Sequence, residues 1–209
     1  MWGLFNVKNE QRDIIVAITG ASGALYATRT LAALLERGCH VDLIVSEYGR
    51  RLLRDELGES ASVDKLTDYL ASNYGGGVAN GTYTLHSNKD LGAKIASGSQ
   101  NSEAMVIVPC SMKTLAGVAH GLSRNLVERA ADVMLKERRR LVLVARETPM
   151  SLPQLRNMVL CAEAGAMMLP AMPAFYQMPN TLADLADFMA GKILGALGFE
   201  HDLYPPWKG

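Results

Sequence analysis

The feature that most constrains this chain is a short apolar run that stops at a glycine-rich turn and leads directly into a helical pattern. Residues 13–19 (DIIVAIT) are rich in β-branched side chains and predict a strand, and residues 20–23 (GASG) form the turn. Residues 24–38 then have apolar side chains at helical spacing and stop at a glycine. A second strand predicted at residues 40–45 and a helix at 47–58 complete a parallel strand–helix–strand unit, because such a crossover needs a dozen or more residues.

The rest of the chain continues this alternation of strands and helices. Further strands are predicted at residues 104–109, 141–145 and 166–170, and further helices at 63–72, 114–120, 124–137, 151–165 and 181–197. Residues 73–88 are rich in Gly and Asn and predict a loop with room for one short strand. The sequence therefore predicts one doubly wound α/β domain over residues 13–209, with a mostly parallel sheet, helices on both faces and an aromatic C-terminal tail. Residues 1–12 are expected to form a flexible extension.

Composition and charge argue against several classes of function. The 21 basic and 21 acidic residues give a formal net charge of +0, so the chain lacks the positive field expected of nucleic-acid or anionic-membrane binding. Cys39, Cys110 and Cys161 are far apart with no CxxC pair, which argues against a disulfide scaffold or a metal site. The N-terminus lacks a signal-peptide pattern, and no apolar run approaches about 18 residues. We therefore expect a cytoplasmic protein that binds anions only at a local site.

Small, hydroxylic or charged residues follow four of the predicted strands, where an open parallel sheet binds its ligands. They are the GASG turn, Ser46, residues 110–114 and the pair Arg146–Glu147. The turn would let backbone N–H groups approach an anion at a helix N-terminus, although the GxGxxG dinucleotide pattern and the Walker pattern are both absent. The alternative is structural: Ser22 and the other hydroxyl groups would only cap helices.

Two basic residues of the predicted helix at 124–137 point to a phosphorylated substrate. Arg129 and Lys136 are seven residues apart, so they lie on roughly the same helix face about 10 Å apart. Such cations near the carboxylate of Glu147 suit transfer of a phosphorylated group. The alternative for the basic residues is a solvated helix face, which is favoured for residues 138–140. The alternative for Glu147 is an ion pair with Arg146 or Lys136. Cys110 is expected to be a buried packing residue, because no histidine has a sequence context that marks it as an activating base.

Together these segments resemble the UbiX-like flavin prenyltransferases, within the FMN-binding flavoproteins that also include peptidyl-cysteine decarboxylases. The resemblance spans residues 13–207 and is carried by TGASGALY, IVSEYG, ASGS (96–99), VIVPCSMKTLAG, LVERAADVMLKERRRLVLVARETPMS and LPAMPAFYQMP, followed by Trp207. Members of this family join a dimethylallyl group from dimethylallyl monophosphate to N5 and C6 of reduced FMN, without a metal. The prenylated FMN then serves a separate UbiD-like decarboxylase.

The resemblance implies a role for residues in each motif. The FMN-binding residues would be Gly20, Ala21, Ser22, Ser46, Ser111, Met112, Lys113, Thr114 and Arg146. The prenyl phosphate would be bound by Tyr176 and Lys192, with Arg129, Lys136, Ser97 and Trp207. The catalytic residues would be the carboxylates Glu147 and Glu56 and the hydroxyl of Ser22. Lys192 replaces an arginine that many members carry, which keeps the charge but loses bidentate phosphate geometry.

The resemblance also implies a homo-oligomer, a dodecamer whose sites are shared between subunits. Two alternative functions remain open. One is an FMN-dependent peptidyl-cysteine decarboxylase, which would use FMN as a redox partner, whereas the cations at positions 129, 136 and 192 suit a phosphate substrate. The other is a non-catalytic flavin-carrier subunit of a decarboxylase.

Overall fold

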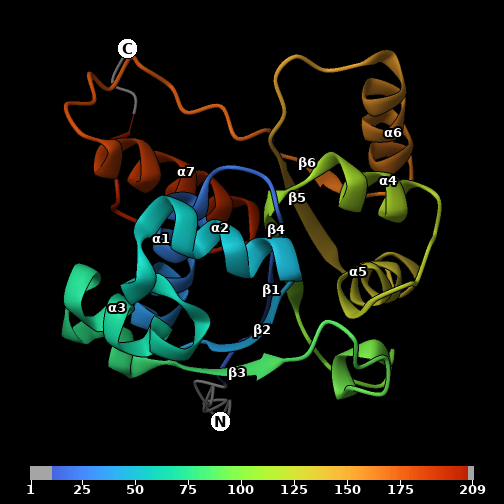
Figure 1. Ribbon diagram of the computed structural model, residues 1–209, viewed down its shortest axis with the longest axis horizontal. Helices are drawn as coiled ribbons and strands as arrows, with labels where there is room; N and C mark the ends of the chain where they lie inside the picture. The colour runs from blue at the N-terminus through green and yellow to red at the C-terminus, as the bar shows by residue number, and fades with distance from the viewer. Residues whose placement is uncertain (1–10, 207–209) are drawn as a thin grey trace, which may run out of the picture.

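The computed structural model describes residues 11–206 and confirms the predicted α/β architecture (Figure 1). In this part of the chain, six parallel strands form one sheet in the order β3-β2-β1-β4-β5-β6. They are β1 (Asp13–Ile18), β2 (His40–Val45), β3 (Thr82–His86), β4 (Ala104–Cys110), β5 (Arg140–Ala145) and β6 (Met167–Met168). The direction of winding reverses between β1 and β4, and the crevice at such a switch point is where ligands bind. Residues 1–10 of the predicted extension, and Trp207, lie outside the described residues.

Helices cover both faces of the sheet, as Figure 1 shows. One face is covered by α1 (Ala24–Glu36), α2 (Glu47–Leu57), α3 (Leu66–Tyr74) and α7 (Leu182–Ala196). The other is covered by α4 (Met112–Ala119), α5 (Leu126–Lys136) and α6 (Leu152–Glu163). Short 3₁₀ turns occupy residues 59–61, 63–65, 76–80 and 94–96. No helix within residues 11–206 is both long and apolar enough to cross a membrane.

The central strands are buried on both sides and separate two apolar cores. In β1, Ile14, Val16 and Ile18 belong to the core under α1 and α7, whereas Ile15 and Ala17 belong to the core under α4 and α5. Strands covered on both faces carry unbroken apolar runs rather than alternating ones. This is why the runs at β1, β2, β4 and β5 could be recognised in the sequence.

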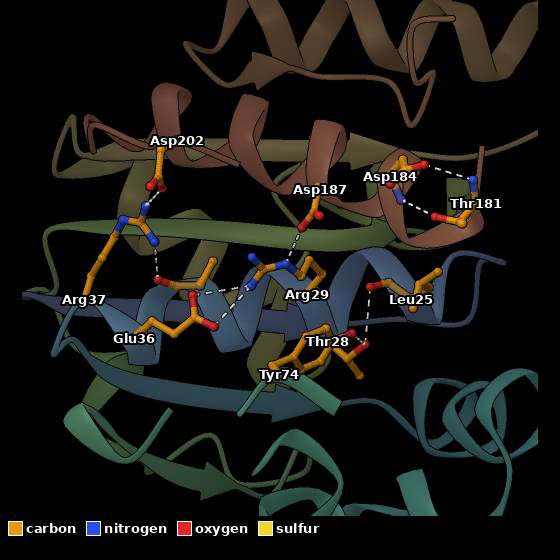
Figure 2. Close-up of polar contacts among 11 residues, drawn as sticks. Leu25, Thr28, Arg29, Glu36, Arg37, Tyr74, Thr181, Asp184, Asp187 and Asp202 are labelled. Carbon is orange, nitrogen blue, oxygen red and sulfur yellow. Dashed lines mark hydrogen bonds and ion pairs between the residues drawn. The ribbon is translucent and has the colours of Figure 1, made fainter. Parts of the chain in front are cut away.

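A polar network joins α1 to α7 (Figure 2). Arg29 Nε donates to Asp187 Oδ1 at 2.5 Å, and the same guanidinium contacts Glu36 at 3.4 Å. Thr181 caps α7, and Asp184 completes a reciprocal capping box. These contacts fix the position of α7 and of the residues it presents to solvent.

Two local features differ from the sequence predictions, and a third makes one prediction definite. Helix α4 begins at Met112 rather than at residue 114, because Ser111 caps it and accepts the Thr114 N–H at 3.3 Å. Residues 82–86 form the one short strand for which the sequence left room, an edge strand whose side chains are mostly exposed and show no apolar pattern. Arg139, expected on a solvated face, instead donates to Gly98 O at 2.8 Å.

Candidate functional site

A cavity of about 310 Å³ opens at the carboxyl ends of the strands. The residues that line it follow β1, β2, β3 and β4 or begin α5: Thr19, Gly20, Ser46, Glu47, Tyr48, Asn88, Ser111, Lys113, Thr114, Asn125, Val127 and Glu128. The structure therefore brings together five of the predicted FMN-binding residues, those at positions 20, 46, 111, 113 and 114. It also adds lining residues that sequence reasoning missed.

Thr19 is the missed residue that joins the two central strands at this cavity. Its buried hydroxyl donates to Pro109 O at 2.7 Å and accepts the Ser111 N–H at 2.8 Å. The ends of β1 and β4 are thereby fixed relative to each other, which sets the position of Ser111. The sequence feature that could have indicated this role is a hydroxyl side chain at the last position of the first apolar run, directly before the GASG turn.

Ser46 and Ser111 each have both of the roles that the sequence allowed, as helix caps and as residues of the candidate ligand site. Ser46 Oγ accepts the Gly49 N–H at 3.0 Å, and Ser111 Oγ accepts the Thr114 N–H, so both residues cap helices. Both also line the cavity. A hydroxyl that accepts one N–H can still donate its own hydrogen to a ligand.

The N-terminus of α1 is occupied by a carboxylate of the chain itself. Glu56 Oε2 accepts the N–H groups of Gly23 at 3.0 Å and Ala24 at 2.8 Å. Gly23 is the N-cap residue, so the alternative in which Ser22 caps this helix is wrong. The anion that the sequence predicted beside these two N–H groups is therefore the Glu56 carboxylate of the chain itself. It accepts hydrogen bonds from N–H groups that have no partner within the first turn of a helix. Ser22 keeps an exposed side chain beside the turn.

Arg146 lies beside the GASG turn, and neither Arg146 nor Glu147 lines the cavity. Arg146 Nε donates to Ser22 O at 3.2 Å. Glu147 Oε1 accepts the Thr148 N–H at 3.1 Å, and among residues 11–206 it forms no ion pair. The alternative in which Glu147 pairs with Arg146 or Lys136 is therefore wrong within this part of the chain. Two other predicted FMN-binding residues, Ala21 and Met112, are buried and do not line the cavity.

Glu128 places a buried carboxylate in the cavity wall. Burial would raise the pKa of this carboxyl, but hydrogen bonds from the Arg124 side chain and backbone outweigh it and hold the pKa below its usual range. Gly117 leaves the space that Glu128 occupies, because a Cβ at position 117 would lie 2.6 Å from Glu128 Oε1. The ionised Glu128 is thus a fixed part of the site.

Asn88 closes the cavity on the side of β3. Its backbone oxygen accepts the Leu126 N–H at 2.9 Å, and its Oδ1 accepts the Val127 N–H at 3.1 Å. The loop after β3 is thereby docked on the first turn of α5. This contact could not be predicted from local sequence, because nearly forty residues separate the partners.

Arg129, Lys136 and Ser97 form a second group, away from this cavity. Arg129 Nε donates to Ala96 O at 3.0 Å, Lys136 pairs with Glu137, and Ser97 Oγ lies 2.8 Å from Ser99 Oγ. Lys136 ends α5 and lies four residues before β5 begins, which places it near the amino edge of the sheet. Within one chain these residues do not reach the cavity at the carboxyl edge.

Tyr176 and Lys192 form a third group around Phe188, on the α1–α7 face. The Tyr176 and Phe188 rings are 6.1 Å apart and nearly perpendicular. Lys192 Nζ lies 5.5 Å from the centroid of the Phe188 ring. The predicted phosphate-binding residues are thus divided between the two faces of the sheet, and Trp207 lies outside the described residues.

Other features of the chain carry less chemistry. Cys110 is fully buried, and burial raises the pKa of its thiol, which confirms its packing role. Within residues 11–206, no three His, Cys, Asp or Glu side chains gather into a metal-binding group.

A second cavity, of about 300 Å³, lies between α1, α3 and α7. Its Arg29 is already neutralised by Asp187 and Glu36, so the cavity at the carboxyl edge is the better ligand site (Figure 2).

Comparisons with known proteins show the family of this chain. A family model described as Flavoprotein matches residues 5–193. Flavin prenyltransferase UbiX of Halalkalibacterium halodurans is 46% identical over 193 residues, which cover 92% of this chain and 91% of that protein. This chain belongs to the UbiX flavin prenyltransferase family.

Solved structures of this family share the whole fold. A crystal structure of AnUbiX in complex with FMN and dimethylallyl pyrophosphate matches with a TM-score of 0.85 and 37% identity, covering 96% of this chain and 99% of that one. A dodecameric FMN-dependent UbiX-like decarboxylase from Escherichia coli O157:H7 matches with a TM-score of 0.82 and 37% identity, covering 94% and 100%. The predicted family and fold class are confirmed.

Proposed function

We propose that this protein is a flavin prenyltransferase, which transfers the dimethylallyl group of dimethylallyl monophosphate to N5 and C6 of reduced FMN and releases inorganic phosphate. The observation that carries this proposal is the cavity at the carboxyl edge, with its hydroxyl groups and Lys113, in a chain of the UbiX family. No metal takes part in the proposed reaction.

The residues of the cavity fit a mononucleotide. Its volume of about 310 Å³ lies at the lower end of the range of about 300–1,000 Å³ for small-molecule sites. Ser46, Ser111 and Thr114 supply hydroxyl donors, and Lys113 supplies a positive charge for the phosphate. The GASG turn departs from the GxGxxG dinucleotide pattern, so FMN is favoured over FAD or NAD. When bound, reduced FMN supplies the electron-rich ring atoms that accept the prenyl group.

The remaining residues act on the prenyl phosphate. Cleavage of the carbon–oxygen bond of the ester dianion, with one proton supplied to the phosphate, leaves an allylic cation and a hydrogen phosphate dianion. Lys192, Arg129 and Lys136 would stabilise its charge, and in the single chain Arg129 and Lys136 are paired with Asp132 and Glu137. We assign Glu147 as the acid that donates a proton to a phosphate oxygen, since its carboxyl forms no ion pair in the described part of the chain. Glu56 holds the GASG turn in place, and Ser22 presents its hydroxyl beside it.

A complete phosphate site needs more than one copy of the chain. Lys192 lies on α7 and Arg129 on α5, and these helices cover opposite faces of the sheet. Apolar side chains that a contact between copies would cover are exposed in the single chain. On α6, Leu152, Leu155 and Val159 lie three and four positions apart and are 45–58% exposed. We infer a homo-oligomer, and the dodecamer of the Escherichia coli UbiX-like protein supports this inference.

The recipient of the product would be a UbiD-like decarboxylase, which uses the prenylated flavin. The two alternative functions differ from this one in what they leave in solution. A peptidyl-cysteine decarboxylase would oxidise its substrate with FMN and form no prenylated flavin, and a carrier subunit would bind FMN without converting it.

The test is anaerobic incubation of the purified protein with reduced FMN and dimethylallyl monophosphate in the presence of a chelator, followed by mass spectrometry of the flavin. We expect a flavin heavier by one prenyl unit and the release of inorganic phosphate. FMN recovered unchanged, from protein that binds it, would contradict the proposal and favour the carrier function. Tighter binding of FAD or NAD than of FMN would contradict the assignment of the cavity.

A further inference from the structure

The C-terminal segment folds back over α7 and packs against the helix face that carries Lys192. The Tyr204 ring lies 4.9 Å from the Phe188 ring, and the His201 ring lies 4.9 Å from Tyr204. The segment is also held by polar contacts: Gln177 Nε2 donates to Pro205 O at 2.9 Å. Tyr204 is therefore part of the packed structure.

Gly191 makes this close packing possible. A Cβ at position 191 would lie 2.5 Å from Tyr204 Cε1 and 2.7 Å from His201 Cε1, which are distances that real Cβ atoms do not show. The neighbouring residue on the helix is Lys192. At the other end of the segment, Arg37 Nε donates to Glu200 O at 3.2 Å. The Arg37 guanidinium also lies 3.9 Å from Asp202 Oδ1 and pairs with it (Figure 2).

The Lys192 ammonium is held by aromatic rings. Its Nζ lies 5.5 Å from the centroid of Phe188 and 5.9 Å from that of Tyr204, within the range of cation–π contacts. No carboxylate within residues 11–206 forms an ion pair with it. Ring contacts orient a cation without neutralising it, so the full charge of Lys192 is left for an anion.

We propose that Tyr204 is a positioning residue for the phosphate ester, because its ring, together with that of Phe188, fixes the Lys192 ammonium. This inference rests on the proposed function, in which Lys192 binds the prenyl phosphate. A lysine is a point charge on a flexible four-carbon stem and lacks the planar fork of an arginine. Its position must therefore be set by its neighbours, and the tail supplies one of the two rings that do so.

The test compares Tyr204→Leu, which removes the ring, with Tyr204→Phe, which keeps it. We expect Tyr204→Leu to raise the KM for dimethylallyl monophosphate about two- to fivefold, the size of an exposed cation–π contact, with kcat and FMN affinity close to those of the unmodified protein. Tyr204→Phe should restore the original KM. Calorimetric titration of dimethylallyl monophosphate into the FMN-loaded protein should show the same change in affinity.

A double-mutant cycle separates positioning from packing. In a Lys192→Met background, Tyr204→Leu should have no further effect on phosphate-ester affinity. An equal loss of affinity in both backgrounds, or an unchanged KM in a folded Tyr204→Leu variant, would overturn the proposal. If Tyr204→Leu does not fold, Gly191→Ala, which displaces the ring while keeping both side chains, must raise the KM instead. Failure of the unmodified protein to prenylate FMN would contradict the proposed function, whereas calorimetry would still report on Tyr204.

Discussion

The Glu56 carboxylate accepts the Ala24 N–H at 2.8 Å, and this contact joins α2 to the N-terminus of α1. The same oxygen accepts the Gly23 N–H at 3.0 Å. A helix N-terminus carries roughly half a positive charge, so a carboxylate there stabilises both the helix and the turn before it. Glu56 thus sets the shape of the GASG turn, on which the Arg146 guanidinium and the Ser22 hydroxyl depend.

Glu56→Ala should destabilise the fold by about 1–2 kcal/mol, the usual cost of losing an N-terminal cap, and should weaken FMN binding. Glu56→Gln keeps an oxygen that can accept both N–H groups and should recover most of the stability. Urea unfolding curves of the two variants measure the difference. If the Gln variant is as stable as the unmodified protein but turns over slowly, the charge of Glu56 acts in the reaction as well. Equal stability of all three proteins would show that the cap contributes nothing.

Thr19→Val should destabilise the fold by about 1–3 kcal/mol, because it leaves Pro109 O and the Ser111 N–H without their buried hydroxyl partner. FMN affinity should fall as well, since Ser111 loses its fixed position. Thr19→Ser retains the hydroxyl and is the matched control. Urea unfolding and FMN titration on both variants test this, and a Val variant that matches the Ser variant in both would show that the contact is dispensable.

Glu147→Gln should reduce turnover by about 10²–10⁴-fold, the usual contribution of a placed acid, while FMN affinity and melting temperature change little. The side chain forms no ion pair within residues 11–206, so its replacement should not cost stability. Single-turnover prenyl transfer, measured beside a melting curve, separates the two effects. Unchanged turnover in a well-folded Gln variant would remove Glu147 from the mechanism.

Stability should fall as the solution is acidified through the range in which His201 titrates. Burial, with Arg37 and Lys192 nearby, lowers the pKa of His201 below its ordinary value of 6.5. Below about pH 6.5 the unfolded chain therefore takes up this proton before the folded chain does, and the free energy of unfolding decreases until the folded pKa is reached. Above that range His201 is neutral in both states and contributes no pH dependence. Melting temperatures from about pH 5 to 7.5 should change less steeply in His201→Gln; an identical slope would contradict this assignment.

The sequence predicted the elements of this fold well wherever burial is two-sided. The strands β1, β4 and β5 are unbroken apolar runs, and β2 is interrupted only by the buried Asp42. The carboxyl ends of β1, β2 and β4 line the cavity as expected, whereas Arg146 and Glu147, which follow β5, do not. Strand β3 was less clear, because an edge strand with exposed side chains has no apolar pattern. Its role is to place Asn88 at the cavity.

The parts of the site that could not be predicted depend on contacts between distant segments. Glu56 lies more than thirty residues from the N–H groups that it caps, so local spacing allowed only Ser22 to be considered as the cap. Glu128 fits its place only because position 117 lacks a side chain. Arg139 binds Gly98 O across about forty residues, which a run of three arginines does not reveal. In each case the tertiary fold, rather than local propensity, selects the partner.

Complementation between two inactive variants is the most direct test of a prenyl-transfer site that combines residues from both faces of the sheet. Lys192→Met and Arg129→Met would each be purified, shown to be folded and inactive, then mixed, dissociated and reassembled. Because Lys192 and Arg129 would come from different copies at each site, mixed oligomers contain some sites with both cations, and prenylated FMN should form again. If the mixture stays inactive while co-assembly is verified by native mass spectrometry, the two residues do not serve one shared site.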